Sequence, residues 1–134
     1  MSREFCSPAT LPPPVGYSHI AKVTSGTLIF ISGQVPSDSS GNLVGEDNFE
    51  AQVEQVLKNL TLALEAVGAS MADIVKMNFY LGAEVSENDV PKLRAIRERY
   101  LGNADLPAGT LVYVSRLSRP GWLVEIEAVA VIDG

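Results

Sequence analysis

The sequence predicts an α+β domain with segments in the order β-β-α-β-α-β-β and two helices on one face of the sheet. Three observations lead to this fold class. Apolar residues recur at the helical repeat in two segments, they alternate with polar residues in predicted strands, and glycine, proline and serine separate the segments. A length of 134 residues fits a single domain, residues 1–134, that buries a core of its own.

The N-terminal part is predicted to contain extended chain followed by a hairpin. Residues 1–15 are rich in proline and are expected to run extended over the surface. Strands are predicted at residues 20–24 and 27–32. Ser25 and Gly26 form a two-residue link between these strands, which is the spacing of a β-hairpin.

The first predicted helix has the clearest periodicity in the chain. Its apolar residues fall on one helical face: Phe49, Val53, Val56, Leu57, Leu60, Leu64 and Val67. Asp47 followed by Glu50 resembles a capping box at the start of this helix. Gly68 is placed to end it.

A strand, a second helix and two further strands complete the pattern. Residues 73–82 alternate in polarity, with one face formed by Val75, Met77, Phe79 and Leu81 and the other by Lys76, Asn78 and Tyr80. The second helix is predicted over residues 87–101, with a weaker apolar stripe of Val90, Leu93, Ile96 (or Arg97) and Tyr100. The last two strands are predicted within residues 109–117 and 121–132.

Two carboxylates distinguish the last predicted strand. Alternation places Glu125 and Glu127 on one side, about 7 Å apart by the strand rise. Burial of such groups without partners is costly, so they need water, a cation or polar neighbours. A sheet face that is partly apolar and partly charged is typical of a subunit interface with a wet cleft, which predicts an oligomer. We interpret Glu127 as structural, whereas Glu125 either forms a salt bridge with Lys22 or Lys76 or has a functional role.

Composition excludes several classes of function. The net charge is −6, which disfavours nucleic acid and anionic membrane surfaces as partners. The single cysteine, Cys6, allows no intrachain disulfide or cysteine metal cluster, and the single histidine, His19, allows no histidine-rich metal site. Phosphate-binding glycine motifs are absent as well. We therefore expect no metal and no cofactor. No apolar stretch is long enough to span a bilayer or form a signal peptide, which predicts a cytoplasmic location.

Several stretches resemble the Rid family, also called the YjgF or L-PSP endoribonuclease-like family. They are "VGYSHIAKV", "ISGQVP", "GNLVG", the long segment from Phe49 to Leu81, and "VEIEAVAV", so the resemblance covers residues 16–131. It implies a chorismate mutase-like fold and a homotrimer with clefts between subunits. It also implies hydrolytic deamination of reactive enamines or imines, such as 2-imino acids, to a ketoacid and ammonia without a cofactor.

The resemblance also assigns residues to this cleft. Tyr17 matches a tyrosine that lines it, Ser32 and Gly33 match the pair at its floor, and Glu125 matches the carboxylate that positions the attacking water. A carboxylate near an electrophilic imine carbon can polarise water and move its proton. Tyr17 can alternatively be a packing tyrosine with its hydroxyl at the surface. Ser32 and Gly33 can alternatively mark the end of a strand.

The main departure from the family pattern lies in "PAGT", residues 107–110. Deaminating members read Pro-Ala-Arg-Ser/Thr, and the resemblance implies that their arginine grips the substrate carboxylate. This chain has Gly109 at that position and keeps the hydroxyl at Thr110, so both are assigned to substrate binding. The substrate is therefore different, or a cation comes from elsewhere in the chain.

Three arginines are candidates for such a cation. Arg94 stands where the resemblance implies an asparagine in the deaminating members, and it is assigned to substrate binding, although a solvated helix arginine is the alternative. Arg97 and Arg116 are the other candidates. A further departure is Leu111, which replaces a cysteine of the family pattern.

Three functions remain open from the sequence. The first is hydrolysis of an enamine or imine, with a small molecule as substrate and other copies of the chain as partners. The second is a non-catalytic trimer that binds a metabolite, because the arginine is missing. The third is ribonuclease or translation-inhibitor activity, which the acidic charge and the absence of a basic groove disfavour.

Overall fold

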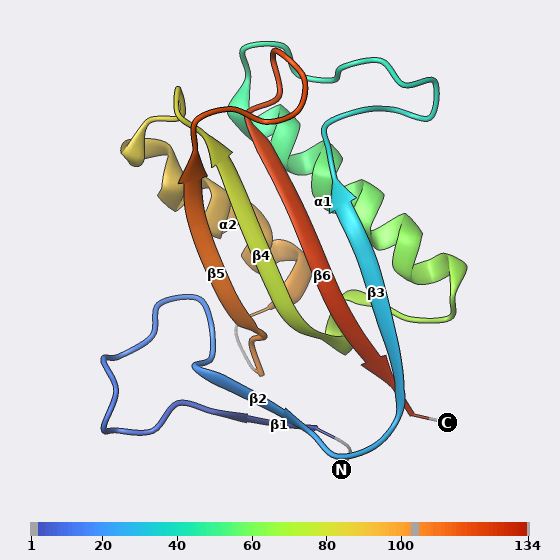
Figure 1. Ribbon diagram of the computed structural model, residues 1–134, viewed down its shortest axis with the longest axis vertical. Coiled ribbons are helices and arrows are strands. Elements are labelled where there is room, and N and C mark those ends of the chain that lie inside the picture. Colours follow the sequence, from blue (N-terminus) through green and yellow to red (C-terminus); the bar gives the residue numbers. More distant parts are fainter. Residues whose placement is uncertain (1–2, 103–104, 134) are drawn as a thin grey trace.

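Two helices cover one face of a four-stranded sheet, and a separate two-stranded ribbon lies beside one end of it (Figure 1). The computed structural model describes residues 3–102 and 105–133, so the first two residues of the predicted extended segment lie outside the described part. The elements are β1 (Arg3–Cys6), β2 (Ile20–Val23), β3 (Thr27–Gln34), α1 (Phe49–Ala66), β4 (Ile74–Gly82), α2 (Val90–Leu101), β5 (Ala108–Val114) and β6 (Val124–Ile132). Short 3-10 turns precede β4 and α2. The predicted α+β class is confirmed.

The sheet is mixed, with strand order β3-β6-β4-β5. β6 runs antiparallel to both β3 and β4, whereas β4 and β5 are parallel. The alternation predicted for residues 73–82 is confirmed, because Met77, Phe79 and Leu81 are buried while Lys76, Asn78 and Tyr80 are less so. The buried side chains pack with α1 and α2 in one hydrophobic core.

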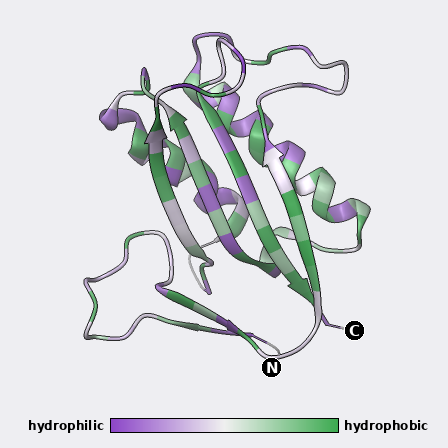
Figure 2. Cartoon of the chain, in the orientation of Figure 1, coloured by the Kyte–Doolittle hydropathy of each residue, from purple (hydrophilic) through white to green (hydrophobic). Residues whose placement is uncertain are grey.

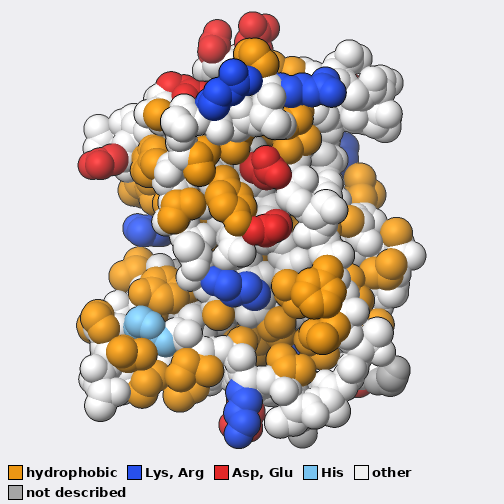
Figure 3. Space-filling model, in the orientation of Figure 1, with side chains coloured by type: hydrophobic (Ala, Val, Ile, Leu, Met, Phe, Trp, Pro, Cys, Tyr) orange, Lys and Arg blue, Asp and Glu red, His pale blue; other side chains and the backbone are white. Residues whose placement is uncertain are grey.

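The face of the sheet that the helices do not cover is chemically mixed. In this view of β4 and β6, hydrophilic and hydrophobic residues alternate along the strands (Figure 2). Phe30 and Leu28 on β3 are 76% and 55% exposed. Acidic side chains near the middle of the sheet lie next to hydrophobic ones, with a basic side chain just below them in this view (Figure 3). We refer to this surface, formed by the outward side chains of the four strands, as the open face.

The predicted hairpin of residues 20–24 and 27–32 is wrong. β2 pairs with β1, with Cys6 opposite Ile20, whereas β3 pairs with β6. The chain changes sheets at Gly26, whose φ of +116° is open to glycine. A Cβ at Gly26 would lie 2.8 Å from the Ile132 carbonyl oxygen, so the link packs against the end of β6 rather than closing a hairpin. The N-terminal segment, predicted only as extended chain, supplies a strand.

The ribbon is held to the main sheet through Arg3. Its guanidinium donates to the Val131 carbonyl oxygen at 2.6 Å and forms an ion pair with Asp73 at 3.2 Å. These contacts join the first strand of the chain to the last strand of the sheet and to the turn before β4. They anchor the start of the proline-rich segment, and at its other end the Ser18 amide donates to the Pro107 carbonyl oxygen at 3.0 Å.

Helix α1 forms over the predicted residues but is capped differently. Asn48, in an extended conformation, accepts a hydrogen bond from the Ala51 amide at 3.0 Å. The predicted capping box is wrong, because Asp47 has a φ of +55° and precedes the cap. At the other end Gly68 adopts a φ of +77°, as its predicted role requires. Val67, predicted for the apolar face, is 52% exposed at the C-cap.

Helix α2 begins at Val90, three residues later than predicted, because residues 87–89 form a 3-10 turn. Pro91 lies in its first turn, where the missing amide hydrogen matters least. Gly102 ends the helix and donates to the Glu98 carbonyl oxygen at 2.7 Å. The sequence offered either Ile96 or Arg97 for the apolar stripe of this helix. Both side chains are buried on the face of the helix that packs on the protein. Within the described residues, neither helix is long and apolar enough to cross a membrane.

We predict that Asn48→Ala lowers the free energy of unfolding by about 1 kcal/mol, because the amide of Ala51 loses its capping partner. Asp47→Asn is the matched control, since asparagine tolerates the left-handed conformation of this position. Urea unfolding of both variants measures the difference. Equal destabilisation by the two changes would contradict the observed cap.

Candidate functional site

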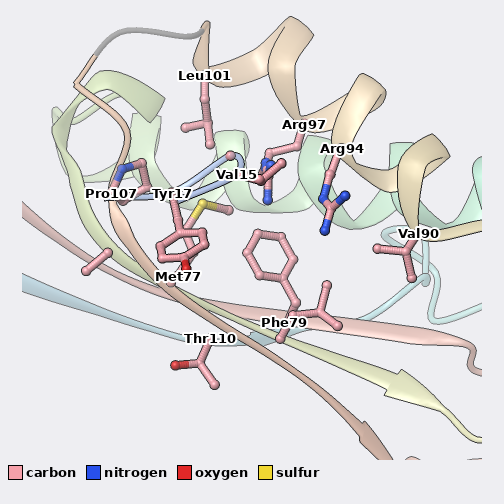
Figure 4. Close-up of a pocket in the computed structure, with 14 residues that line it drawn as sticks. Val15, Tyr17, Met77, Phe79, Val90, Arg94, Arg97, Leu101, Pro107 and Thr110 are labelled. Carbon is pink, nitrogen blue, oxygen red and sulfur yellow. The ribbon is translucent and has the colours of Figure 1, made fainter. Parts of the chain in front are cut away.

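A cavity of about 390 Å³ lies between α2, the start of β5 and the loop at residues 15–17. Its wall includes Tyr17, Phe79, Arg94, Arg97, Gly109 and Leu111 (Figure 4). Four of the residues that the sequence assigns to substrate binding therefore line one cavity, namely Tyr17, Arg94, Gly109 and Thr110. The sequence placed Phe79 only on the apolar face of its predicted strand. The size is within the range of small-molecule sites, roughly 300–1,000 Å³.

Two arginines project from α2 into this cavity (Figure 4). Arg97 is only 9% exposed, and its guanidinium carbon lies 5.5 Å from the centre of the Phe79 ring. Arg94 lies one turn earlier, with more of its side chain exposed. Burial lowers the pKa of Arg97, and the charge of Arg94 lowers it further. Among the described residues, no carboxylate forms an ion pair with either guanidinium.

The loop before β2 closes over Arg97. Gly16 has a φ of +78°, and a Cβ there would overlap Nη2 of Arg97. The positive φ favours glycine here, and its missing side chain leaves room for the guanidinium. The next residue, Tyr17, packs edge-to-face on His19 with ring centres 5.3 Å apart. His19 contacts the Pro12 carbonyl oxygen at 2.7 Å, which ties the loop to the proline-rich segment.

Gly109 is not a conformational requirement. Its φ lies outside the left-handed region, and a Cβ there would make ordinary contacts, 3.5 Å from Tyr17 Cβ and 3.6 Å from the Met77 carbonyl oxygen. The backbone therefore tolerates a side chain, and the glycine leaves this part of the wall open. Thr110 behaves differently: its side chain points away from the cavity (Figure 4) and accepts a hydrogen bond from Lys76 Nζ at 2.9 Å.

A second group of predicted residues lies on β3 and β6. A Cβ at Gly33 would overlap Oε2 of Glu125, so the carboxylate lies directly against the Gly33 backbone. The pairing of β3 with β6 shifts register between Ile31 and Gln34, and Ser32 and Gly33 fall in this irregularity. Such irregularities re-aim strand residues and are common beside functional sites. The structure therefore brings together Gly33 and Glu125, two of the residues that the family resemblance assigns to the cleft.

The two carboxylates of β6 have different environments. Glu127 accepts hydrogen bonds from the Tyr80 hydroxyl and from Asn78 Nδ2, the latter at 3.1 Å, and these bonds lower its pKa. Glu125 receives no hydrogen bond from the described residues. Burial raises the pKa of Glu125, and the neighbouring charge of Glu127 raises it further. Glu127 thus has the partners that its structural interpretation requires, whereas Glu125 has no hydrogen-bond donor among the described residues.

The salt bridge considered for Glu125 is not formed. Lys76 bonds to Thr110, and its charge acts on Glu127. Lys22 lies in the separate ribbon, opposite Glu4. The described residues also contain no group of three histidine, cysteine, aspartate or glutamate side chains that could hold a metal ion.

The two groups of predicted site residues lie apart within one chain. β5 carries Gly109 at one edge of the sheet and β3 carries Ser32 and Gly33 at the other, three strand spacings or roughly 14 Å away. Of the three candidate cations, Arg94 and Arg97 line the cavity beside Gly109. Arg116 instead lies in a hollow with Glu125, Glu127 and Tyr80, and donates to the carbonyl oxygens of Leu117 and Ser118 at 3.1 and 3.4 Å.

Sequence reasoning missed two features of the cavity. Arg97 was a candidate cation and also the alternative to Ile96 on the apolar stripe of α2, but the sequence did not join these two roles into a buried cation that lines a cavity. Gly16 was not singled out at all. Its role depends on a contact with a residue that lies 81 positions further along the chain, which no local pattern records.

Comparison with known proteins places this geometry in a family. The family model described as Endoribonuclease L-PSP matches residues 8–132. A RutC family protein of Pyrococcus abyssi is 35% identical over 131 residues, covering 97% of this chain and 98% of the relative. The 2-iminobutanoate/2-iminopropanoate deaminase of Salmonella typhimurium is 34% identical over 127 residues, covering 93% and 91%.

Solved structures agree with this assignment. The crystal structure of YyfB from Yersinia pestis, described as a protein of unknown function of the conserved Rid family, superposes with a TM-score of 0.90 at 37% identity, covering 98% of this chain and 100% of that chain. A putative endoribonuclease from Thermotoga maritima gives a TM-score of 0.72 at 35% identity, covering 96% and 93%. From Pro8 to Ile132, therefore, the chain belongs to the Rid family.

Proposed function

We propose that the protein hydrolyses a reactive enamine or imine of the 2-imino acid type, in a cleft completed by a neighbouring subunit. The observation that carries this proposal is the carboxylate of Glu125, which lies against the Gly33 backbone, is partly buried and has no hydrogen-bond donor among the described residues. Such a group is poised to act on water. The deaminase names of relatives from Salmonella typhimurium and Dermatophagoides farinae support the same chemistry.

The reaction needs one proton acceptor that later becomes a proton donor. Ionised Glu125 takes a proton from water as the water oxygen attacks the imine carbon, giving a tetrahedral carbinolamine. The protonated carboxyl returns this proton to the nitrogen. The carboxylate then takes the hydroxyl proton of the carbinolamine and passes it to the nitrogen as the carbon–nitrogen bond breaks, which leaves a ketoacid and ammonia. One water is consumed, and no electrons are transferred to or from a cofactor.

The cleft requires a second copy of the chain. The cavity with Tyr17 lies at the β5 edge, while Glu125 and Gly33 lie toward the other edge on the open face. We propose that the homotrimer implied by the family resemblance covers the open face, on which Phe30 is 76% exposed. The cavity lined by Tyr17 in one subunit would then face the part of the open face that carries Glu125 in the next subunit.

A non-catalytic trimer that binds a metabolite is the second candidate, favoured by the open wall at Gly109. Thermal shift measurements separate the two functions, since a ligand of the native state raises the melting temperature whether or not it reacts. Stabilisation by a 2-oxo acid together with inertness toward all imines would favour this candidate. Ribonuclease activity fits poorly with the net charge of −6.

We predict that Glu125→Gln reduces turnover of 2-aminoacrylate-type imines by about a hundredfold or more, because the amide cannot accept the proton of water. The imines are generated in situ by amino-acid oxidases, and the ammonia released above the buffer rate is measured. Glu46→Gln, a change at an exposed loop position, is the matched control. Unchanged turnover by Glu125→Gln, or active protein that light scattering finds only as single protomers, would refute the proposal.

The pH profile gives an independent prediction. Glu125 must be ionised to act, so turnover rises with pH through its pKa, which burial and Glu127 hold above the usual value. Glu127→Gln removes the neighbouring negative charge and is expected to move this acid limb to lower pH. The limb is measured from turnover between pH 4 and 8 (about the range where carboxyls with a raised pKa titrate). A limb that stays in place would show that Glu125 is not the titrating group.

The stability of the Glu125→Gln variant shows whether it loses activity merely because it unfolds. Because burial disfavours the charged form of Glu125, its ionisation opposes folding at a pH above its raised pKa. The Glu125→Gln variant should therefore be at least as stable as the wild type at neutral pH. This difference should vanish as the pH falls below the ordinary carboxyl pKa, where both forms are neutral.

A further inference from the structure

The guanidinium of Arg97 is unusual among the basic groups of this chain. Among the described basic side chains, Arg3, Lys92 and Arg99 form ion pairs with carboxylates, whereas Lys22, Lys58 and Arg94 form none but are exposed to solvent. Arg97 is 9% exposed and forms no ion pair or hydrogen bond with the described residues; its nearest aromatic contact is the Phe79 ring. A charge this deeply buried is costly unless something compensates it.

A second positive charge makes the absence of a counterion more marked. Arg94 precedes Arg97 by three residues on α2, and both line the same cavity. Like charges at this helical spacing repel each other. Glu98, the next residue on α2, raises the pKa of Arg97 through its charge, but it is exposed and forms no ion pair with the guanidinium. An anion in the cavity would balance both arginines.

The shape and lining of the cavity indicate which anion fits. Gly109 leaves the sheet side of the wall open, although the backbone would accept a side chain there. Phe79, Tyr17 and Leu111 provide apolar surface next to the arginines. A planar, forked guanidinium pairs best with a planar carboxylate, and the apolar wall suits a short carbon chain.

We infer that Arg97, assisted by Arg94, is the carboxylate anchor of this cavity, so that the acid group of a small 2-oxo or 2-imino acid is held from helix α2 rather than from strand β5. Arg97 fixes the charge deep in the cavity, and Arg94, nearer the entrance, closes over it. The identity of the ligand as a 2-imino acid rests on the proposed function. The binding of a carboxylate by these two arginines does not.

The test is the affinity for 2-oxobutanoate, a stable acid of the product class, measured by calorimetric titration of the full-length protein. We expect saturable binding by the wild type, and affinity about tenfold or more weaker in Arg97→Gln and in Arg94→Gln, because each loses a charged hydrogen bond. Arg99→Gln, which removes the same charge from the same helix outside the cavity, should bind like the wild type. The uncharged methyl ester should bind the wild type and Arg97→Gln equally weakly.

The outcomes separate this inference from the proposed function. Absent binding by the wild type, or unchanged affinity in both arginine variants, would overturn the anchor, even if imine turnover remained. Binding that depends on the arginines in a protein without turnover would uphold the anchor and refute the hydrolase. Since Arg97 packs on Phe79 and against Gly16, its variant is checked for folding; Arg94, which is more exposed, carries the test if that variant does not fold.

Discussion

The register between β4 and β6 is the constraint on which the rest of the structure depends. Tyr80 lies opposite Glu125 and Asn78 opposite Glu127, so both carboxylates stand on the open face beside polar strand neighbours. The intervening residues, such as Phe79 and Ile126, face the helices and form the core. A slip by one residue would turn the glutamates into that core and the apolar residues outward. Folding and the position of the proposed base are therefore set by the same pairing.

The same register produces two unlike carboxylates from two identical residues on one strand. Glu127 takes the donors that β4 provides, the Tyr80 hydroxyl and the Asn78 amide. Glu125, two residues away, meets the Gly33 backbone and receives no donor from the described residues. Ionised Glu127 also raises the pKa of Glu125. The carboxylate that has hydrogen-bond donors therefore shifts the pKa of the one that has none. An arrangement of this kind is typical of sites where one acidic group must exchange protons with water.

Local periodicity explains what the sequence could predict. The apolar face of α1, the alternation in β4 and the shared side of Glu125 and Glu127 follow from repeats within a few residues. The predicted hairpin was wrong because strand pairing is non-local. β2 pairs with the N-terminal strand β1, and the chain turns at Gly26 into the main sheet. The predicted cap, Asp47, and the observed cap, Asn48, differ by one position. Residue type alone cannot decide between them, because aspartate and asparagine are both good N-caps.

The arrangement of the candidate site could be predicted only in part, for a related reason. The residue types indicated the chemistry, but they did not indicate that Tyr17 and Gly109 lie at one edge of the sheet and Gly33 at the other. They gave Arg97 only as an alternative to Ile96 on the apolar stripe of α2, because an arginine on an amphipathic helix is ordinarily solvated. These facts depend on strand order and on the loop through Gly16, which are properties of the folded chain.

Separation of the proposed anchor from the proposed base has a physical consequence. If Arg97 and Glu125 met within one chain, they would form an ion pair, and neither would remain available to a substrate. The sheet keeps them on different faces and near opposite edges, so each stays without a partner of opposite charge among the described residues. On the proposed trimer, only a bound ligand then lies between a cation of one subunit and a carboxylate of the next. The cost of leaving both charges unpaired in the free protein is thus compensated when an anionic, electrophilic substrate enters.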